Sequence, residues 1–403
     1  MVASSKLLSA EEALQIITQS APPSPTEIVG LSRAAGRILR QPVFADRDFP
    51  PFDRVTMDGI AIAYAAFAQG NRQFRIAHTV MAGSVPPPLT HPTECVEIMT
   101  GAPLPHGADT VVRYEDLALH GSIAVIKPEA TVVPQQNVHR RASDATAQSL
   151  LINTGCMLTA SQIAVAAACG YHTLAVSRLP KTAIVSTGDE LVPIETHPEP
   201  HQIRQSNMYM LAAQLLPYGI EAEMIHVADQ PQTIIDTLMP LLEQCELIIL
   251  SGGVSAGKAD YIPTLLKEAG IEILFHGVQQ KPGKPLLFGK SHRTTVFGLP
   301  GNPVSAFMCM KRYVTAWLQK YLLQNAPLPT YACLAANVSS PPALTYFLPV
   351  QSFTDQHGKV WAVPQAGSGS GDFVNLLAAN AFLVLPPSQT PFQKGETFAL
   401  LPF

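Results

Sequence analysis

The fold of this 403-residue chain is decided by the stretch Leu247-Ile248-Ile249-Leu250-Ser251-Gly252-Gly253-Val254-Ser255-Ala256-Gly257-Lys258-Ala259-Asp260-Tyr261. Four apolar residues predict a buried strand, the glycines a tight loop, and Asp260 the opening of a helix. Such a corner brings backbone N–H groups, a helix N-terminus and a carboxylate to one edge of a sheet. It suits a phosphorylated or otherwise anionic ligand bound with a divalent metal.

The sequence around this stretch alternates between strands and helices. Strands are expected at residues 182–186, 221–227, 246–250, 271–276, 285–288 and 295–298, and helices at 206–218, 231–244, 260–269 and 303–323. This alternation predicts a mostly parallel sheet with helices on both faces. Ligands of such sheets bind beyond the carboxyl ends of the strands.

Outside this region the chain lacks the regular alternation of strands and helices. Residues 9–12 read as a capping box before a helix to residue 20, and further helices are expected at 31–38 and 161–168. Between them, short alternating runs broken by proline and glycine indicate an inserted β-rich domain, and strands at 332–338, 359–363, 381–385 and 397–400 indicate a small C-terminal β-domain. We therefore predict four domains: residues 1–45 with 136–178 (helical and linking), 46–135 (inserted, β-rich), 179–326 (α/β) and 327–403 (β).

Composition excludes several classes of protein. The net charge of −4 lacks the basic field of a nucleic-acid binder, and no apolar run is long enough to cross a bilayer or to serve as a signal peptide. The six cysteines form no Cys-x-x-Cys pair, which indicates reduced thiols. We expect a cytoplasmic protein with neither nucleic acid nor membrane as a partner.

Three groups of residues suit an anion or a metal. Glu190 and Asp260, with Asp189 as an accessory, are candidate Mg²⁺ ligands, because that ion needs one or two carboxylates and takes its other ligands from water and phosphate. The loop Ser251–Ser255 offers glycine N–H groups and hydroxyls, although it lacks the Gly-Lys-Ser/Thr of a Walker motif. Lys281 and Lys284 flank a stiff Pro-Gly turn.

Each group also has a purely structural explanation. Asp260 reads equally as a helix N-cap, the glycine loop as a packing turn, and the two lysines as an exposed hairpin. Asp58-Gly59 and Thr100-Gly101 are ordinary turn formers, and His139-Arg140-Arg141 suits an anion site or a solvated face equally well.

Six stretches, in order along the chain, together resemble the molybdopterin molybdenumtransferases of the MoeA family, which is similar to the E domain of gephyrin. They are residues 52–59, 98–109, 186–191, 251–261, 281–285 and 298–305. The resemblance implies a molybdopterin-binding-like α/β domain and an elongated homodimer. In that dimer the cleft lies between the α/β domain of one protomer and the inserted β-rich domain of the other.

The resemblance also implies a reaction and its partners. Adenylylated molybdopterin and molybdate are the substrates, molybdenum enters the dithiolene, AMP leaves, and Mg²⁺ is required. Implied partners are a second copy of the chain, the molybdopterin adenylyltransferase and molybdoenzyme-maturation proteins.

Residue roles carry over position by position. Glu190 and Asp260 would hold Mg²⁺ against the pyrophosphate link, and Lys281 and Lys284 would offset developing negative charge. Implied catalytic or positioning residues are Asp58, Thr100, Asp144, Asp229, Lys281 and Lys284. Implied substrate-binding residues are Thr187, Gly188, Ser251, Gly252, Gly253, Ser255, Pro300, Gly301, Asn302 and Pro303.

This chain departs from the family pattern at two places. Ala142-Ser143 precedes Asp144 where the family usually has Gly-Glu, and Pro349 stands where the family often has an arginine. The first removes a tight glycine turn, and the second removes a contact from the C-terminal domain to substrate, although Ser370 matches a family serine. Two other functions stay open: adenylylation of molybdopterin, which related α/β domains carry out with little else attached, and a gephyrin-like peptide-binding scaffold.

Overall fold

The computed structural model describes the chain except residues 1–6, 255–260, 326–327, 366, 368 and 370. The described residues fall into two compact units. The first takes in the chain up to Arg40, Thr154–Thr159 and Thr173–Phe403, and the second comprises Gln41–Asn153 and Ala160–His172. Our finer division into four domains stays a prediction at its stated boundaries.

The first unit contains the expected α/β sheet. Its strand order is β16 (Glu223–Val227), β13 (Thr182–Thr187), β17 (Leu247–Ser251), β21 (Thr295–Leu299), β20 (Leu287–Lys290) and β18 (Glu272–His276). The first four strands are mutually parallel, and β20 and β18 run antiparallel at one side. The prediction of a mostly parallel sheet is therefore confirmed.

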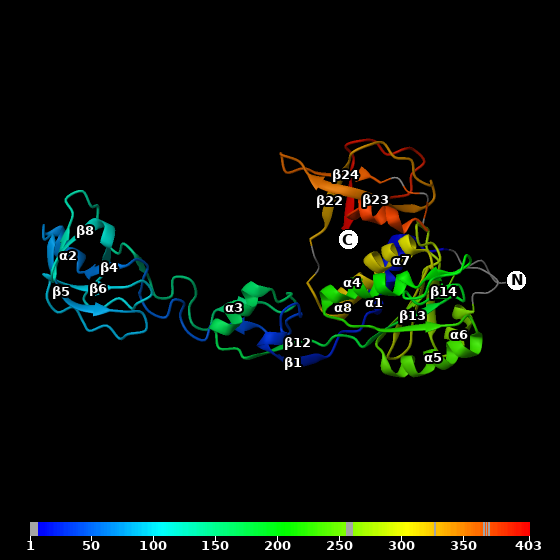
Figure 1. The fold of residues 1–403 in the computed structure, drawn as a ribbon, viewed down its shortest axis with the longest axis horizontal. Helices are drawn as coiled ribbons and strands as arrows, with labels where there is room; N and C mark the ends of the chain where they lie inside the picture. Colours follow the sequence, from blue (N-terminus) through cyan, green and yellow to red (C-terminus); the bar gives the residue numbers. More distant parts are fainter. Residues whose placement is uncertain (1–6, 255–260, 326–327, 366, 368, 370) are drawn as a thin grey trace. The chain divides into compact units, whose positions relative to one another are not determined.

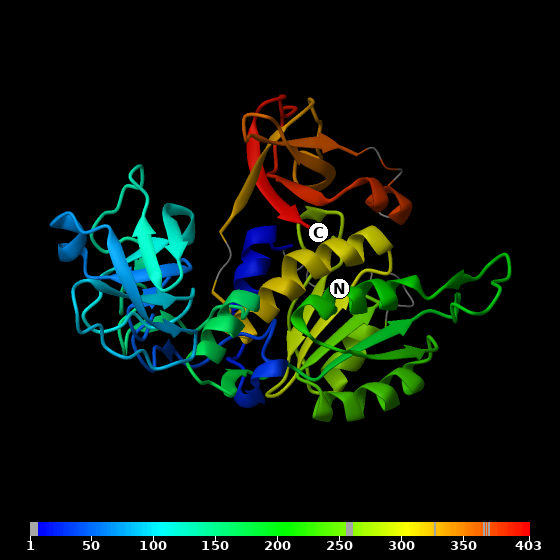
Figure 2. The same ribbon diagram turned by 60° about the vertical axis from the view of Figure 1, so that its left-hand side comes forward.

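Helices cover both faces of this sheet (Figures 1 and 2). One face carries α1 (Ala10–Ser20), α4 (Ser206–Leu215), α7 (Pro303–Cys309), the π-helical segment η4 (Met310–Val314) and α8 (Thr315–Tyr321), and the other carries α5 (Pro231–Gln244) and α6 (Ile262–Glu268). Because side chains alternate along a strand, Ile249 joins the core under the first group and Ile248 the core under the second. The predicted capping box of α1 is confirmed: Glu12 N–H donates to Ser9 Oγ at 3.2 Å, and Ser9 N–H donates to Glu12 Oε2 at 2.7 Å.

Two helix predictions need correction. Residues 31–38 do not form a helix beyond the short 3₁₀ turn η1 (Leu31–Arg33), because Gly36 takes a left-handed φ of 77° and Ile38 then pairs in extended form with Met157. The predicted helix 303–323 is divided by the π-helical segment η4. Elsewhere in this unit β1 (Thr26–Gly30) pairs with β12 (Thr173–Ser177), and β14 (Leu191–Val192) pairs with β15 (Ile203–Arg204). A 3₁₀ turn, η3 (Leu216–Tyr218), follows α4.

The C-terminal part of the first unit is a closed β-barrel. Pairings run from β23 (Thr345–Thr354) through β24 (Val360–Pro364), β22 (Thr330–Leu334), β26 (Thr397–Pro402) and β25 (Ala381–Leu385) back to β23. The short strand β19 (Gln280–Lys281) adds to β23, and η5 (Phe373–Ala378) is a 3₁₀ helix. Our reading missed β23, because Pro349 interrupts its sequence pattern; in the barrel Pro349 lies opposite Phe382.

The second unit is built on the predicted β-rich segment. Its sheet has the order β7 (Thr110–Arg113), β4 (Gly59–Ile62), β6 (Glu94–Ile98), β5 (Gln73–Val80), β9 (Ile123–Ile126) and β8 (Leu117–His120). Two small pairs lie outside this sheet: β2 (Val43–Phe44) with β11 (Leu150–Ile152), and β3 (Arg54–Val55) with β10 (Val138–His139). The helices of this unit are α2 (Tyr64–Ala68), η2 (Tyr114–Asp116) and α3 (Ala160–Ala168).

The structure bears on membrane-spanning helices and on the state of the cysteines. None of the helices that the structure describes is both long and apolar enough to cross a bilayer. None of the six cysteines, all of which the structure describes, forms a disulfide, and five of them are buried.

Candidate functional site

The parallel strands of the α/β sheet end level with one another. Ser186 of β13 lies opposite Ser251 of β17, and Ser251 lies opposite Leu299 of β21. The loops that follow these strands therefore leave the sheet at its carboxyl edge, where folds of this kind bind ligands.

A cleft of about 1050 Å³ opens at this edge. Glu190 and Asp229 line it, and so does every described residue that the family resemblance assigned to substrate: Thr187, Gly188, Ser251, Gly252, Gly253, Pro300, Gly301, Asn302 and Pro303. Ser255 and Asp260, the other predicted residues of this region, lie outside the described residues. The volume is sufficient for a ligand of nucleotide size.

The glycine loop after β17 requires its two glycines. Gly252 and Gly253 have φ values of 101° and 65°, which side-chain-bearing residues rarely adopt. A Cβ on Gly252 would lie 2.7 Å from the Thr187 carbonyl oxygen, and one on Gly253 would lie 2.8 Å from Ile262 Cγ1. The loop is thus packed closely against β13 and α6 and faces the cleft with bare backbone.

Glu190 and Asp189 differ in their contacts. Gly188 has a φ of 144°, and a Cβ there would lie 2.8 Å from a carboxylate oxygen of Glu190, so the glycine makes room for this carboxylate at the cleft. Asp189 Oδ1 instead accepts the backbone N–H of Asp229 at 3.0 Å and ties two cleft loops together.

The donor set of the cleft is compatible with Mg²⁺. Glu190 and Asp229 contribute carboxylate oxygens, which that ion prefers. Among the residues that the structure describes, no three His, Cys, Asp or Glu side chains form a metal-binding group. A metal here would therefore depend on one or two carboxylates and on substrate oxygens.

A second cavity, of about 390 Å³, contains both predicted lysines. Lys281 and Lys284 line it, together with Ser305 of α7 and residues of the C-terminal barrel. Pro285, Pro300 and Asn302 line both cavities, so the lysine turn and the carboxylate cleft adjoin. The ammonium group of Lys281 lies 5.6 Å from the centre of the Tyr346 ring, and Pro349 forms part of the wall.

Asn207 is a functional candidate that sequence reasoning missed. Its side-chain amide lines the cleft and donates to Ser251 Oγ at 3.1 Å and to the Gly301 carbonyl at 2.7 Å. It therefore bridges the loops that follow β17 and β21. A polar residue in the first turn of a helix at the carboxyl edge of the sheet is the signal that could have identified it.

In the second unit, Asp58 and Thr100 contact each other. Thr100 donates its backbone N–H and its hydroxyl to the same oxygen, Asp58 Oδ1. These two hydrogen bonds hold the pKa of Asp58 below its ordinary value, with a small opposing effect from burial. Both side chains are exposed, so the ionised carboxylate is available to a ligand or to a partner.

Asp144, in the loop after β10, belongs to a chain of three side chains with Arg54 of β3 and His139 of β10. Arg54 Nη2 lies 3.0 Å from His139 Nδ1, and His139 Nε2 lies 2.7 Å from Asp144 Oδ1. A guanidinium can only donate, so Nδ1 accepts, and Nε2 carries the proton that it donates to Asp144. His139 is thus a specific partner of Asp144 and not part of a merely solvated face.

The turn before Asp144 forms although Ala142 stands where the family usually has glycine. Ala142 takes a left-handed φ of 63°, and its N–H donates to the Pro50 carbonyl at 3.0 Å. The backbone N–H of Asp144 donates to the Phe49 carbonyl at 2.9 Å. Alanine therefore adopts the conformation that glycine would take more easily.

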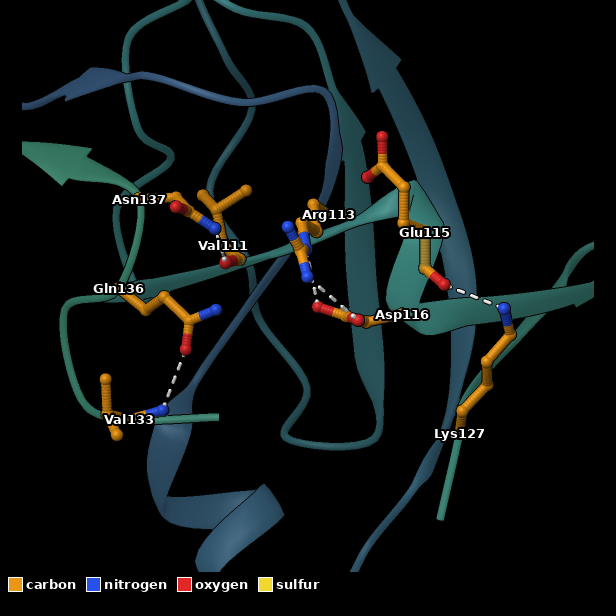
Figure 3. Close-up of polar contacts among 8 residues, drawn as sticks. All are labelled: Val111, Arg113, Glu115, Asp116, Lys127, Val133, Gln136 and Asn137. Carbon is orange, nitrogen blue, oxygen red and sulfur yellow. Dashed lines mark hydrogen bonds and ion pairs between the residues drawn. The ribbon is translucent and has the colours of Figure 1, made fainter. Parts of the chain in front are cut away.

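Asn137 anchors the segment that leads into β10. Its side-chain amide donates to the Val111 carbonyl at 3.0 Å, and Gln136 Oε1 accepts the Val133 N–H at 3.0 Å (Figure 3). Figure 3 also shows the ion pair between Arg113 and Asp116 and the hydrogen bond from Lys127 to the Glu115 carbonyl. The Asn137 and Gln136 contacts hold the backbone that leads into β10 and His139.

Comparison with known families covers nearly the whole chain. Residues 8–170 match the family described as "MoeA N-terminal region (domain I and II)". Residues 183–320 match "Probable molybdopterin binding domain", and residues 331–403 match "MoeA C-terminal region (domain IV)".

Individual proteins of this family are similar to the chain over nearly its full length. A molybdopterin molybdenumtransferase of Synechocystis sp. is 37% identical over 97% of this chain and 99% of its own length. One of Bacillus subtilis is 28% identical over 97% of this chain and 93% of its own. A crystal structure of a MoeA protein from Pyrococcus horikoshii, 28% identical, superimposes with a TM-score of 0.80 over 98% of this chain and 99% of that one.

Proposed function

Because this chain belongs to the MoeA family of molybdopterin molybdenumtransferases, we propose that it transfers molybdenum from molybdate into adenylylated molybdopterin and releases AMP. Its full-length relatives make it a transferase of molybdenum-cofactor biosynthesis. The observation that supports the specific reaction is the junction of the carboxylate cleft with the lysine cavity at Pro285, Pro300 and Asn302.

The cleft side is suited to the adenylylated end of the substrate. The backbone N–H of Gly253 would face the phosphates, because no side chain shields it, whereas the Gly252 N–H donates to the Leu299 carbonyl at 3.2 Å. Glu190, together with Asp260 or Asp229, would hold Mg²⁺, which would neutralise phosphate charge and so make AMP a better leaving group. Asp229 is kept in place by the hydrogen bond to Asp189.

The lysine side is suited to an oxyanion. Lys281 and Lys284 stand on one turn at the 390 Å³ cavity, which has room for molybdate beside the dithiolene of the substrate. Two ammonium groups would attract the dianion and stabilise charge that builds up as oxygen leaves molybdenum. Pro349 cannot add a third positive charge, so in this chain the two lysines carry this role without the arginine of the family.

A second copy of the chain would complete the site. Asp58, Thr100 and Asp144 stand on the unit that does not carry the cleft, and an exposed, ionised Asp58 suits substrate positioning in a partner's cleft. We therefore propose a homodimer in which each cleft uses these residues from the other protomer.

Two assays test the proposal. The protein receives either molybdopterin with ATP, or adenylylated molybdopterin with molybdate and Mg²⁺. We expect consumption of the second pair and AMP release that depends on molybdate, whereas consumption of the first pair alone would indicate an adenylyltransferase. Mixing inactive Glu190→Gln and Asp58→Asn proteins tests the dimer, since a shared cleft restores part of the activity and a cleft within one protomer restores none.

A further inference from the structure

A buried amide lies directly beneath the lysine turn. Gln280 precedes Lys281 in β19 and is 1% exposed. Its Nε2 donates to the Gly283 carbonyl at 2.9 Å, inside the turn, and its Oε1 accepts the hydroxyl of Tyr313, a residue with no exposed surface. A polar chain thus runs from the helical core to the backbone between the two lysines.

The direction of these hydrogen bonds is determined by chemistry. The Gly283 carbonyl can only accept, so the NH₂ group of Gln280 must face it and the amide oxygen must face Tyr313. The tyrosine hydroxyl therefore donates. Nε2 also lies 3.7 Å from Cys309 Sγ, which occupies its second side. Both polar atoms of Gln280 have partners, so the group is well ordered rather than adaptable.

The turn also rests on α7 through Gly283. Its φ is 87°, and a Cβ there would lie 2.6 Å from Cys309 Sγ and 2.9 Å from Met308 Cε. The turn is closed by the Val278 N–H, which donates to the Lys284 carbonyl at 2.8 Å. The backbone of the turn is therefore held, and Lys281 and Lys284 line the cavity together with Gln280 and Gly283.

Tyr313 lies in the π-helical segment η4 between α7 and α8. Such segments are rare and occur frequently at functional sites. The surrounding core is apolar, and a phenylalanine would fill the ring's place, so packing alone does not account for the hydroxyl. The hydrogen bond to Gln280 accounts for the hydroxyl.

We propose that Gln280 and Tyr313 are positioning residues of the oxyanion site, which hold the turn Lys281–Lys284 so that both ammonium groups face the same cavity. This inference rests on the proposed function in one respect, namely that the lysines bind molybdate. Gln280 also lines the cavity, but its amide is engaged with the Gly283 carbonyl and the Tyr313 hydroxyl, so the two residues act through the Gly283 carbonyl.

Tyr313→Phe tests the inference with minimal change of shape. It leaves the Gln280 carbonyl buried and unpaired, so the amide is free to turn and release Gly283. We expect about tenfold weaker equilibrium binding of molybdate, the corresponding increase in KM for molybdate, a smaller decrease in kcat because the lysines also stabilise developing charge, and faster amide hydrogen exchange in residues 278–290. Tyr218→Phe, which removes another tyrosine hydroxyl of the same core away from the turn, should change none of these.

A double variant separates positioning from stability. Tyr313→Phe with Gln280→Met leaves no unpaired amide, so thermal stability should recover in part while molybdate affinity stays low. Wild-type affinity and exchange in Tyr313→Phe, or restored affinity in the double variant, would overturn the inference. If the wild type binds no molybdate, the proposed function fails, and the exchange measurement alone still decides whether these residues hold the turn.

Discussion

Thr100 gives two hydrogen bonds to one carboxylate oxygen of Asp58, from its backbone N–H at 2.6 Å and from its hydroxyl at 2.7 Å. The two residues are 42 positions apart in sequence and read there as separate turns. Together they stabilise the charged form of Asp58, which lowers its pKa below its ordinary value. A constantly ionised, solvent-facing carboxylate is suited to positioning a substrate rather than to delivering a proton.

Thr100→Val should raise the pKa of Asp58 towards its ordinary value, because the larger of the two effects, the hydroxyl bond, is lost. A lowered folded-state pKa stabilises the protein above the unfolded pKa, and this contribution is lost as the pH falls through the folded value. The deficit of the variant should therefore be full near about pH 7 and shrink on acidification below about pH 4. Urea unfolding across this range measures it. Thr100→Ser, which keeps the hydroxyl, should match the wild type, and a deficit independent of pH would contradict the assignment.

Ala142→Gly should stabilise the second unit by about 0.5–1 kcal/mol, because alanine is strained at a φ of 63° and glycine is not. The matched control is Ala145→Gly in the same loop, where φ is not left-handed and glycine should instead cost about 0.5–1 kcal/mol. Chemical unfolding of both variants measures the difference. Loss of stability in Ala142→Gly would mean that the turn is not strained.

Gly188→Ala should raise the Mg²⁺ concentration needed for half-maximal AMP release without unfolding the protein. The new Cβ would lie 2.8 Å from a Glu190 carboxylate oxygen and would displace this carboxylate. Gly270→Ala is the control: its φ of 82° also disfavours a side chain, but no atom lies within 4 Å of its Cβ. Gly270→Ala should lose about 1 kcal/mol of stability, and Gly188→Ala should lose more, because its φ of 144° lies outside the left-handed region that alanine can adopt. A Mg²⁺ titration of AMP release should shift for Gly188→Ala alone, and equal shifts in both variants would contradict a role for Glu190 in metal binding.

Asn207→Asp should reduce turnover by about ten- to a hundredfold, because it replaces two donated hydrogen bonds with a carboxylate facing the Gly301 carbonyl. The side chain hardly changes in size, so the fold should remain. Steady-state AMP release, with circular dichroism to monitor folding, measures this effect. Wild-type turnover would show that the bridge between the two loops is dispensable.

Features that depend on neighbouring residues could be predicted from the sequence, whereas contacts between residues far apart in the sequence could not. The apolar runs before Gly188, Gly252 and Pro300 predicted strand ends, and the alternation with helices placed them at one edge of a sheet. The pairing of Asp58 with Thr100 came only from tertiary structure, since each residue satisfies a local turn equally well. The amide bridge of Asn207 was missed for the same reason.

Backbone features were predictable where residue type determines them. Gly283 and Gly252 take the left-handed φ that glycine permits, whereas Ala142 takes it because Phe49 and Pro50 accept the N–H groups of its turn. Strand β23 could not be predicted from the sequence, because a proline such as Pro349 is normally evidence against a strand. The closed barrel supplies enough partners on either side to retain it.

We propose that Glu190 and Lys284 act on one bound substrate from two adjoining cavities. The most direct measurement is the rate of AMP release from adenylylated molybdopterin, as a function of molybdate concentration, in wild type, Glu190→Gln and Lys284→Ala. We predict that Glu190→Gln loses rate at every molybdate concentration, and that Lys284→Ala needs about tenfold more molybdate to reach half its maximal rate. Molybdate titrations of both variants that coincide with wild type would contradict the account.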